Sequence, residues 1–316
     1  MLSRVAENLY WMARYIERSE NTARQLSVTT NLLLDLPQNT PIGWDSLLAI
    51  LAAEEAFAAR YETTDETQVV HFLSADRDNP GSILSSLAQA RENLRTVRDV
   101  VPREAWEQVN TLFLEARKEV IHGINRNRRH DFLKRIILGC QQLTGLLAGC
   151  MSHDIGYSFA RTGRNLERAD MTSRILDIRS RNLLSPHHEE LPAYENIQWM
   201  SVLKSVSAYQ MYRQHFRIRV RGPEVLRFLL QNQPFPRTVN HCLHEIFGCL
   251  EQMPRSEGAR AHVRATQLRI AAADIGALAE EPEALRGFID SIQLDLARLH
   301  QSITETWFHP PAEPAS

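Results

Sequence analysis

Residues 14–34, RYIERSENTARQLSVTTNLLL, recur without a gap as residues 164–184, RNLERADMTSRILDIRSRNLL. Eight of the 21 aligned positions are identical, namely Arg14, Glu17, Arg18, Thr22, Arg24, Leu26, Leu33 and Leu34 of the first stretch. Five of these eight are polar, so a shared preference for leucine does not account for the match, whereas an internal duplication does. At the centre of each copy is a Glu-Arg pair, Glu17-Arg18 and Glu167-Arg168.

The correspondence continues along the rest of the chain, with an offset that drifts from 150 to 156 residues. Phe72, for example, corresponds to Phe228. A few loop insertions between duplicated helices would produce such a drift. We therefore predict two tandem repeats, residues 1–150 and 151–316, of about six helices each. We expect the repeats to be related by a pseudo-twofold axis and packed together as one unit.

Helical periodicity dominates the sequence. Between Leu2 and Leu36 there is neither glycine nor proline, and apolar residues such as Val5 and Leu9 recur at the spacing of one helical face. This pattern predicts one helix of roughly 30 residues that begins near Ser3. Good helix formers fill the stretches between later glycine and proline breaks, and alternating β-branched runs are almost absent. The sequence predicts an all-α fold, an elongated helical bundle.

The composition argues against several functional classes, namely proteins that bind nucleic acid, span a membrane or hold a metal through cysteines. With 36 Lys plus Arg residues against 38 Asp plus Glu, the chain carries no net positive charge for binding nucleic acid or an anionic membrane. No run reaches the ~18 apolar residues of a membrane span, and no apolar leader is evident, so we expect a cytoplasmic protein. The cysteines lie in apolar stretches without metal-ligand spacing, which predicts buried free thiols, no metal and no cofactor. They are Cys140, Cys150, Cys242 and Cys249.

The charged faces of the two Glu-Arg helices form the candidate site. Each copy is expected to bring two carboxylates beside one arginine, Glu17 and Glu20 with Arg24 in the first and Glu167 and Asp170 with Arg174 in the second. Four further arginines lie on these helices, namely Arg14, Arg18, Arg164 and Arg168. Aromatic residues around the first helix indicate a central position, so we expect the charged groups to be partly buried.

Three interpretations of these faces remain open. Arginine forks can hold a carboxylate or a phosphate, which would make the arginines a ligand or interface site. A desolvated glutamate can act as a general acid or base, and Glu17 and Glu167 are the candidates. The third interpretation is a salt-bridge network that locks the two long helices together, since buried charges need partners in any case.

The stretch LSRVAENLYWMARYIERSENTARQL, residues 2–26, resembles the start of the alpha-E domain family. This is an all-helical domain named after its ER motif and found as a tandem duplication. Here the motif is Glu17-Arg18 and Glu167-Arg168, and the resemblance covers essentially the whole chain. Genes of the family lie beside circularly permuted ATP-grasp ligases and transglutaminase-like proteases. The resemblance therefore implies a component of an ATP-dependent peptide synthesis or modification system.

The first functional hypothesis is a partner of an ATP-grasp ligase, with a transglutaminase-like protease as a second candidate partner. In this hypothesis the chain contributes a docking surface or part of a site for an acidic peptide or amino acid. The alternative is a stand-alone enzyme in which Glu17 or Glu167 acts as general acid or base. A di-iron bundle is a third hypothesis, which the single Glu119-x-x-His122 disfavours because such sites use the motif twice.

Overall fold

The computed structural model describes residues 3–35, 43–183, 192–216 and 219–309. Within these ranges the regular structure is entirely helical, which confirms the predicted all-α fold. The helices are α1 (Ser3–Asp35), α2 (Asp45–Ile50), α3 (Glu54–Ala58), α4 (Glu66–Ser74), α5 (Ile83–Thr96), α6 (Arg103–Ile124), α7 (Arg126–Cys150), α8 (Ile155–Leu183), α9 (Pro192–Ser205), α10 (Tyr209–His215), α11 (Gly222–Gln231), α12 (Val239–Glu251), α13 (Glu257–Ala272), α14 (Ile275–Glu280) and α15 (Pro282–Ile303). A π-helical segment, η1 (Thr304–Phe308), follows α15.

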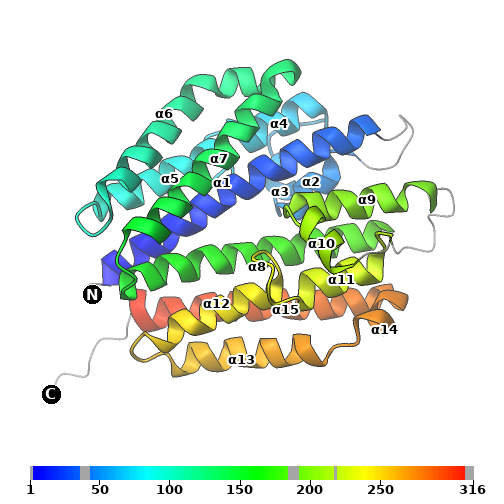
Figure 1. The fold of residues 1–316 in the computed structure, drawn as a ribbon. Coiled ribbons are helices and arrows are strands. Elements are labelled where there is room, and N and C mark those ends of the chain that lie inside the picture. Colours follow the sequence, from blue (N-terminus) through cyan, green and yellow to red (C-terminus); the bar gives the residue numbers. More distant parts are fainter. Residues whose placement is uncertain (1–2, 36–42, 184–191, 217–218, 310–316) are drawn as a thin grey trace.

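The two Glu-Arg helices, α1 and α8, lie side by side at the centre of the molecule (Figure 1). Helix α1 runs for 33 residues, as its unbroken sequence predicts, and α8 for 29. Helices α5 and α7 pack against α1, and α6 covers them from outside. Helices α12 and α15 pack against α8 in the same way and are covered by α13. In each half, two helices therefore pack against the long helix and a third covers them.

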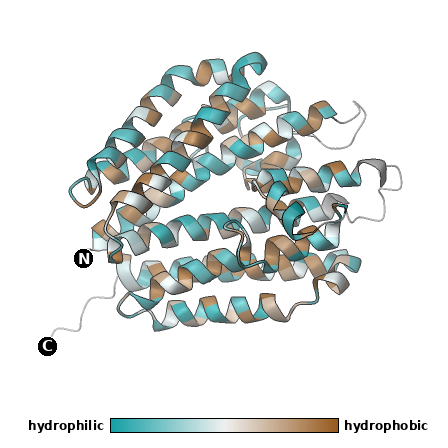
Figure 2. Cartoon of the chain, viewed as in Figure 1, coloured by the Kyte–Doolittle hydropathy of each residue, from teal (hydrophilic) through white to brown (hydrophobic). Residues whose placement is uncertain are grey.

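The halves are joined by one continuous core. A single cluster of buried apolar side chains includes Leu9 and Tyr10 of α1 together with Phe159 and Trp199 of the second half. The short helices also cross over, because α2 contacts α8 while α9 contacts α1. Most helices carry both hydrophobic and hydrophilic residues, as expected for helices with one face in the core and another in solvent (Figure 2).

Local details recur between the halves. Ala52 and Ser207 have left-handed backbones, with φ of 50° and 55°, and follow α2 and α9. Ser82 and Thr238 cap α5 and α12, and each hydroxyl accepts a 3.1 Å hydrogen bond from the backbone N–H three residues later. These matches support the duplication, while the twofold relation between the halves stays a prediction. The described halves hold seven and eight helices, more than the predicted six or so, because short helices occupy several connections.

The prediction for the cysteines is partly wrong. Cys140, Cys242 and Cys249 are buried free thiols, as expected, but Cys150 is exposed. It is the last residue of α7, where the helix leaves the core. None of the helices in the described ranges has both the length and the apolar character that a bilayer crossing requires.

A close approach of α1 and α8 depends on a glycine. A Cβ atom at Gly163 would lie 2.3 Å from the carbonyl oxygen of Tyr10, which is backbone and cannot move aside. We expect Gly163→Ala to lower the free energy of unfolding by about 2–4 kcal/mol, because α1 and α8 must separate to admit the methyl group. Urea unfolding followed by circular dichroism measures this change.

The matched control is Gly145→Ala, since Gly145 of α7 is exposed and a Cβ there meets nothing within 4 Å. That variant should be neutral or more stable by up to about 1 kcal/mol, as alanine favours a helix. Equal stability of the two variants would contradict a close contact at Gly163.

Candidate functional site

The two Glu-Arg motifs meet where α1 packs against α8. Glu167 of α8 accepts hydrogen bonds from two arginines of α1. Its Oε2 lies 2.7 Å from Arg14 Nε, and its Oε1 lies 2.7 Å from Arg18 Nε. Arg18 Nη2 adds a 3.1 Å bond to Oε2, so this pair is bidentate. Arginines of the first copy thus neutralise the glutamate of the second.

Glu17 of α1 is bound in the reverse direction. Arg168 Nε of α8 donates to Glu17 Oε2 over 2.9 Å, and Arg237 Nη1 donates to Oε1 over 2.5 Å. Glu17 is 1% exposed and Glu167 is 3% exposed. The pairing of the two motifs is therefore crossed, because the motif arginine of each copy bonds the buried glutamate of the other copy. We refer to this arrangement as the crossed Glu–Arg network.

A second carboxylate of α1 extends the network. Glu20 accepts hydrogen bonds from Arg237 Nη2 at 2.7 Å, from Gln141 at 3.1 Å and from Arg24. Arg237 therefore lies between Glu17 and Glu20 and bonds both. Burial and the neighbouring charge of Arg237 lower the pKa of Arg24 to about 10, so it remains protonated at neutral pH.

The corresponding side chains of α8 are arranged less tightly. Asp170 and Arg174 form a 2.9 Å ion pair at the i, i+4 spacing and are partly exposed. Arg164 is the counterpart of Arg14, yet its Nε atom is buried and finds no hydrogen-bond partner among the described residues. Burial and the nearby Arg168 lower the pKa of Arg164. The two copies thus share a motif and differ in how the surrounding charges are paired.

The network holds both glutamates in the ionised form. Burial would raise the pKa of Glu167, but Arg14 and Arg18 lower it to about 2. Burial acts on Glu17 in the same way, and the surrounding arginines lower its pKa to about 2 as well. A carboxylate in this state donates no proton near pH 7, where a general acid needs a pKa close to the working pH. The arrangement suits charge pairing better than proton transfer.

Aromatic rings enclose the Arg14 end of the network. The Arg14 guanidinium lies 5.0 Å from the centre of the Trp11 ring and 5.8 Å from that of Tyr10. The Tyr10 hydroxyl lies 2.8 Å from His300 Nδ1 of α15. Burial raises the pKa of Tyr10 to about 12 and lowers that of His300 to about 4, so both groups are neutral at pH 7.

The expected contacts within single helices are partly wrong. Glu20 with Arg24 and Asp170 with Arg174 pair as expected. Glu17 and Arg24 were also expected to lie together, and their charges do interact. The hydrogen bonds of Glu17 and Glu167, however, come from arginines outside their own helices, which the expected contacts within one helix did not include.

Arg237 is the network residue that the sequence interpretation missed. It lies outside the Glu-Arg helices, directly before Thr238, the N-cap of α12. The Arg237 guanidinium is nonetheless buried, and its carbonyl accepts a 2.9 Å hydrogen bond from Thr172. The only available signal was an arginine between a proline-rich turn, Pro234-Phe235-Pro236, and an apolar helix.

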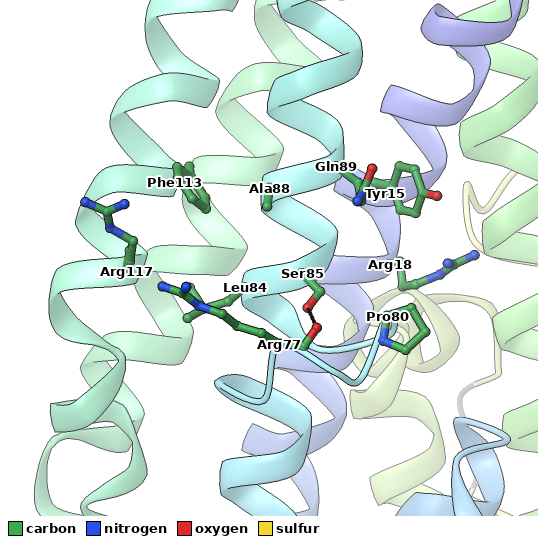
Figure 3. A pocket seen from close by; sticks show the side chains of 10 residues that line it. All are labelled: Tyr15, Arg18, Arg77, Pro80, Leu84, Ser85, Ala88, Gln89, Phe113 and Arg117. Atoms are coloured by element: carbon green, nitrogen blue, oxygen red, sulfur yellow. Dashed lines mark hydrogen bonds between the residues drawn. The ribbon is translucent and has the colours of Figure 1, made fainter. Parts of the chain in front are cut away.

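A cavity of about 540 Å³ opens beside the network, between α1, α5 and α6 (Figure 3). We call it the arginine cavity, and it is lined by Tyr15, Arg18, Arg77, Pro80, Leu84, Ser85, Ala88, Gln89, Phe113 and Arg117. The side chain of Arg18 extends away from Arg77 and Arg117, since its guanidinium is held by Glu167. Arg77 and Arg117 lie at the opposite side of the cavity (Figure 3). Neither forms an ion pair with a carboxylate of the described residues, and the Arg117 guanidinium lies 6.0 Å from the centre of the Phe113 ring.

The metal-site hypothesis finds no geometric support. Glu119 forms an ion pair with Arg135, with its Oε1 atom 2.9 Å from Arg135 Nη1. Across the part of the chain that the structure describes, no three His, Cys, Asp or Glu side chains converge in a group that could hold a metal ion.

Comparison with known proteins identifies related chains. A family model named Alpha-E, described as a predicted alpha-helical domain with a conserved ER motif, matches residues 1–308. Uncharacterised proteins of Mycobacterium bovis and Mycobacterium tuberculosis are 24% identical over 278 residues, which is 81% of this chain. The chain spans 30% of the length of these relatives. No solved structure matches it.

Removing one carboxylate of the network tests its structural role. We expect Glu167→Gln to lower the free energy of unfolding by about 3–5 kcal/mol, because it leaves Arg14 and Arg18 without a counter-charge. The control Glu119→Gln removes a partly exposed pair and should cost no more than ~1 kcal/mol. Chemical denaturation at pH 7 measures both values, and similar small losses in the two variants would contradict a stabilising network.

The lowered glutamate pKa values predict loss of stability in acid. Glu17 and Glu167 bind a proton near pH 2 in the folded protein and near pH 4.5 when unfolded. Their stabilisation is therefore fully present above pH 4.5 and is lost as the pH falls from 4.5 towards 2. Each group contributes on the order of 3 kcal/mol. Urea unfolding measured between pH 7 and pH 2.5 should show this decline, and Glu167→Gln should show a smaller one.

Proposed function

This chain belongs to the Alpha-E domain family, and we propose that it is a non-catalytic partner of an ATP-grasp-type peptide or amide ligase. In this proposal the arginine cavity receives an acidic peptide or amino acid of that system. A transglutaminase-like protease is a second candidate partner. The observation that carries the proposal is the pair of guanidinium groups, Arg77 and Arg117, in the same cavity without a carboxylate partner from the described residues.

The chemistry of the cavity favours an anionic ligand. Arginine binds carboxylates through parallel N–H donors, and an unpaired arginine at the edge of a cavity remains available for such a bond. Phe113 and Tyr15 also line the cavity, where the Arg117 guanidinium lies 6.0 Å from the centre of the Phe113 ring and that of Arg18 lies 5.4 Å from the centre of the Tyr15 ring. A volume of about 540 Å³ accommodates a short peptide segment or an amino acid.

Two further observations support an accessory role. The glutamates of the network are bonded and have pKa values near 2, far from the working pH that a general acid or base needs, which argues against the alternative of a stand-alone enzyme that uses Glu17 or Glu167 as general acid or base. In addition, most of the length of each curated relative lies outside the segment that matches this chain. A domain found within longer chains is suited to work beside other domains.

The test is a co-expression pull-down with a circularly permuted ATP-grasp ligase from the same genome. We expect the wild type to retain the ligase or to bind a capped tetraglutamate peptide in a direct titration. The double variant Arg77→Glu/Arg117→Glu should weaken that binding at least ~10-fold, because each reversal replaces a charge-assisted contact by repulsion.

The matched control is Arg128→Glu/Arg264→Glu, which makes the same charge change at two exposed arginines away from the cavity. It should leave binding and thermal stability unchanged. If both double variants weakened binding equally, the effect would come from the change in net charge, and this result would contradict a specific site. Absence of binding to both the ligase and the peptide would sink the proposal.

A further inference from the structure

Arg237 behaves as a ligand that the chain supplies to itself. It extends from the loop before α12 into the space between Glu17 and Glu20 of α1. One guanidinium nitrogen bonds Glu17, the other bonds Glu20, and Asn21 accepts a further 3.3 Å bond. The Arg237 side chain is only 11% exposed. The second half of the protein thus fills its own guanidinium site.

The matching position in the first half is a glycine. Pro80 and Ser82 precede α5 as Pro236 and Thr238 precede α12, and Ser82 and Thr238 form the same N-cap bonds. Between them lies Gly81 in the first half and Arg237 in the second. The first half therefore has no side chain at the position from which Arg237 enters the space in the second half.

A cavity of about 260 Å³ lies at that point. We call it the Gly81 cavity, and its lining includes Gly81, Arg18, Glu167, Asp170, Arg174 and the left-handed residue Ala52. Glu167 and Asp170 are the counterparts of Glu17 and Glu20, the two carboxylates that Arg237 bonds in the second half. The cavity thus has carboxylates at the same two sequence positions as the filled site.

Both carboxylates retain the capacity to accept another hydrogen bond. Asp170 bonds Arg174 through Oδ2, is partly exposed and lines the cavity. Glu167 Oε1 accepts one bond, from Arg18, although a carboxylate oxygen can accept two. A planar group with several N–H donors on a narrow stem could bridge them, as the guanidinium of Arg237 bridges its own pair.

We propose that the Gly81 cavity binds a guanidinium group on an aliphatic stem, such as an arginine side chain, in the way the second half binds Arg237. The volume of about 260 Å³ limits the ligand to about one side chain, since whole small-molecule sites are usually larger. This site is separate from the arginine cavity proposed above for an anionic ligand. The two cavities share the borders formed by Arg18 and Pro80.

The direct test is a ligand-observed NMR titration of the full chain with N-acetyl-L-argininamide, whose only charge is the guanidinium. We expect saturable binding with a Kd in the millimolar range, roughly what one charged side chain provides. The capped citrulline analogue has the same shape without the charge and should bind at least ~10-fold more weakly. Free L-arginine in a third arm distinguishes a peptide side chain from the free amino acid as the better ligand.

Two variants locate the binding. Asp170→Asn should weaken binding of the capped arginine about 10-fold or more, because it removes one of the two charged acceptors. Gly81→Arg should abolish it by filling the cavity from the chain itself. The backbone φ at Gly81 is not positive, and a Cβ atom there would lie 3.3 Å from Oδ1 of Asn79, a contact that a small shift of this side chain relieves. Thermal melts establish that both variants fold.

The outcomes separate this proposal from the proposed ligase partnership. Arg77→Glu/Arg117→Glu should leave binding of the capped arginine unchanged, since neither residue lines the Gly81 cavity. Binding equal to that of the citrulline analogue would overturn the proposal, as would unchanged binding in the folded Gly81→Arg variant. Absence of binding to the wild type at about 20 mM, above the Kd range expected for one charged group, would overturn it too.

Discussion

The crossed Glu–Arg network, in which arginines of each half bond the motif glutamate of the other half, is the interaction on which the rest of the structure depends. Removing an ionised carboxylate from water costs several kcal/mol, and that cost is offset here only while the arginines stay in position. Glu167 is held by α1, whereas Glu17 is held by Arg168 and Arg237 of the second half. Neither half holds its own glutamate, so the rotation and register of the two long helices are fixed together.

Local signals in the sequence predicted much of the fold. The absence of glycine and proline before Leu36 predicted the length of α1, and the aromatic residues around that helix predicted its central position. A salt-bridge network between the two long helices was one of the three interpretations of the sequence, and the structure contains such a network. Which arginine bonds which glutamate was beyond such reasoning, because a contact between residues about 150 positions apart leaves no mark on helical periodicity. Arg237 shows the same limit, since its role depends on where a loop delivers its side chain.

The two copies satisfy similar carboxylates with different arginines. Arg14 bonds Glu167, whereas Arg164, at the corresponding position of α8, is left without a bond at its Nε atom. In the second half Arg237 supplies the missing donor, and in the first half Gly81 leaves that space open. Duplication explains why the motif occurs twice, and the replacement of an arginine by Gly81 explains why the Gly81 cavity is open while the equivalent space in the second half is filled.

The network connects stability to binding through Arg18. Glu167 fixes its guanidinium with two hydrogen bonds, while the side chain borders both the arginine cavity and the Gly81 cavity. Substitution of Arg18 would therefore unpair a buried carboxylate and reshape two cavities at once, so its effect on binding could not be separated from its effect on folding. Arg77, Arg117 and Gly81 lie at the cavities without taking part in the network, which makes them the positions where function can be altered while the fold is retained.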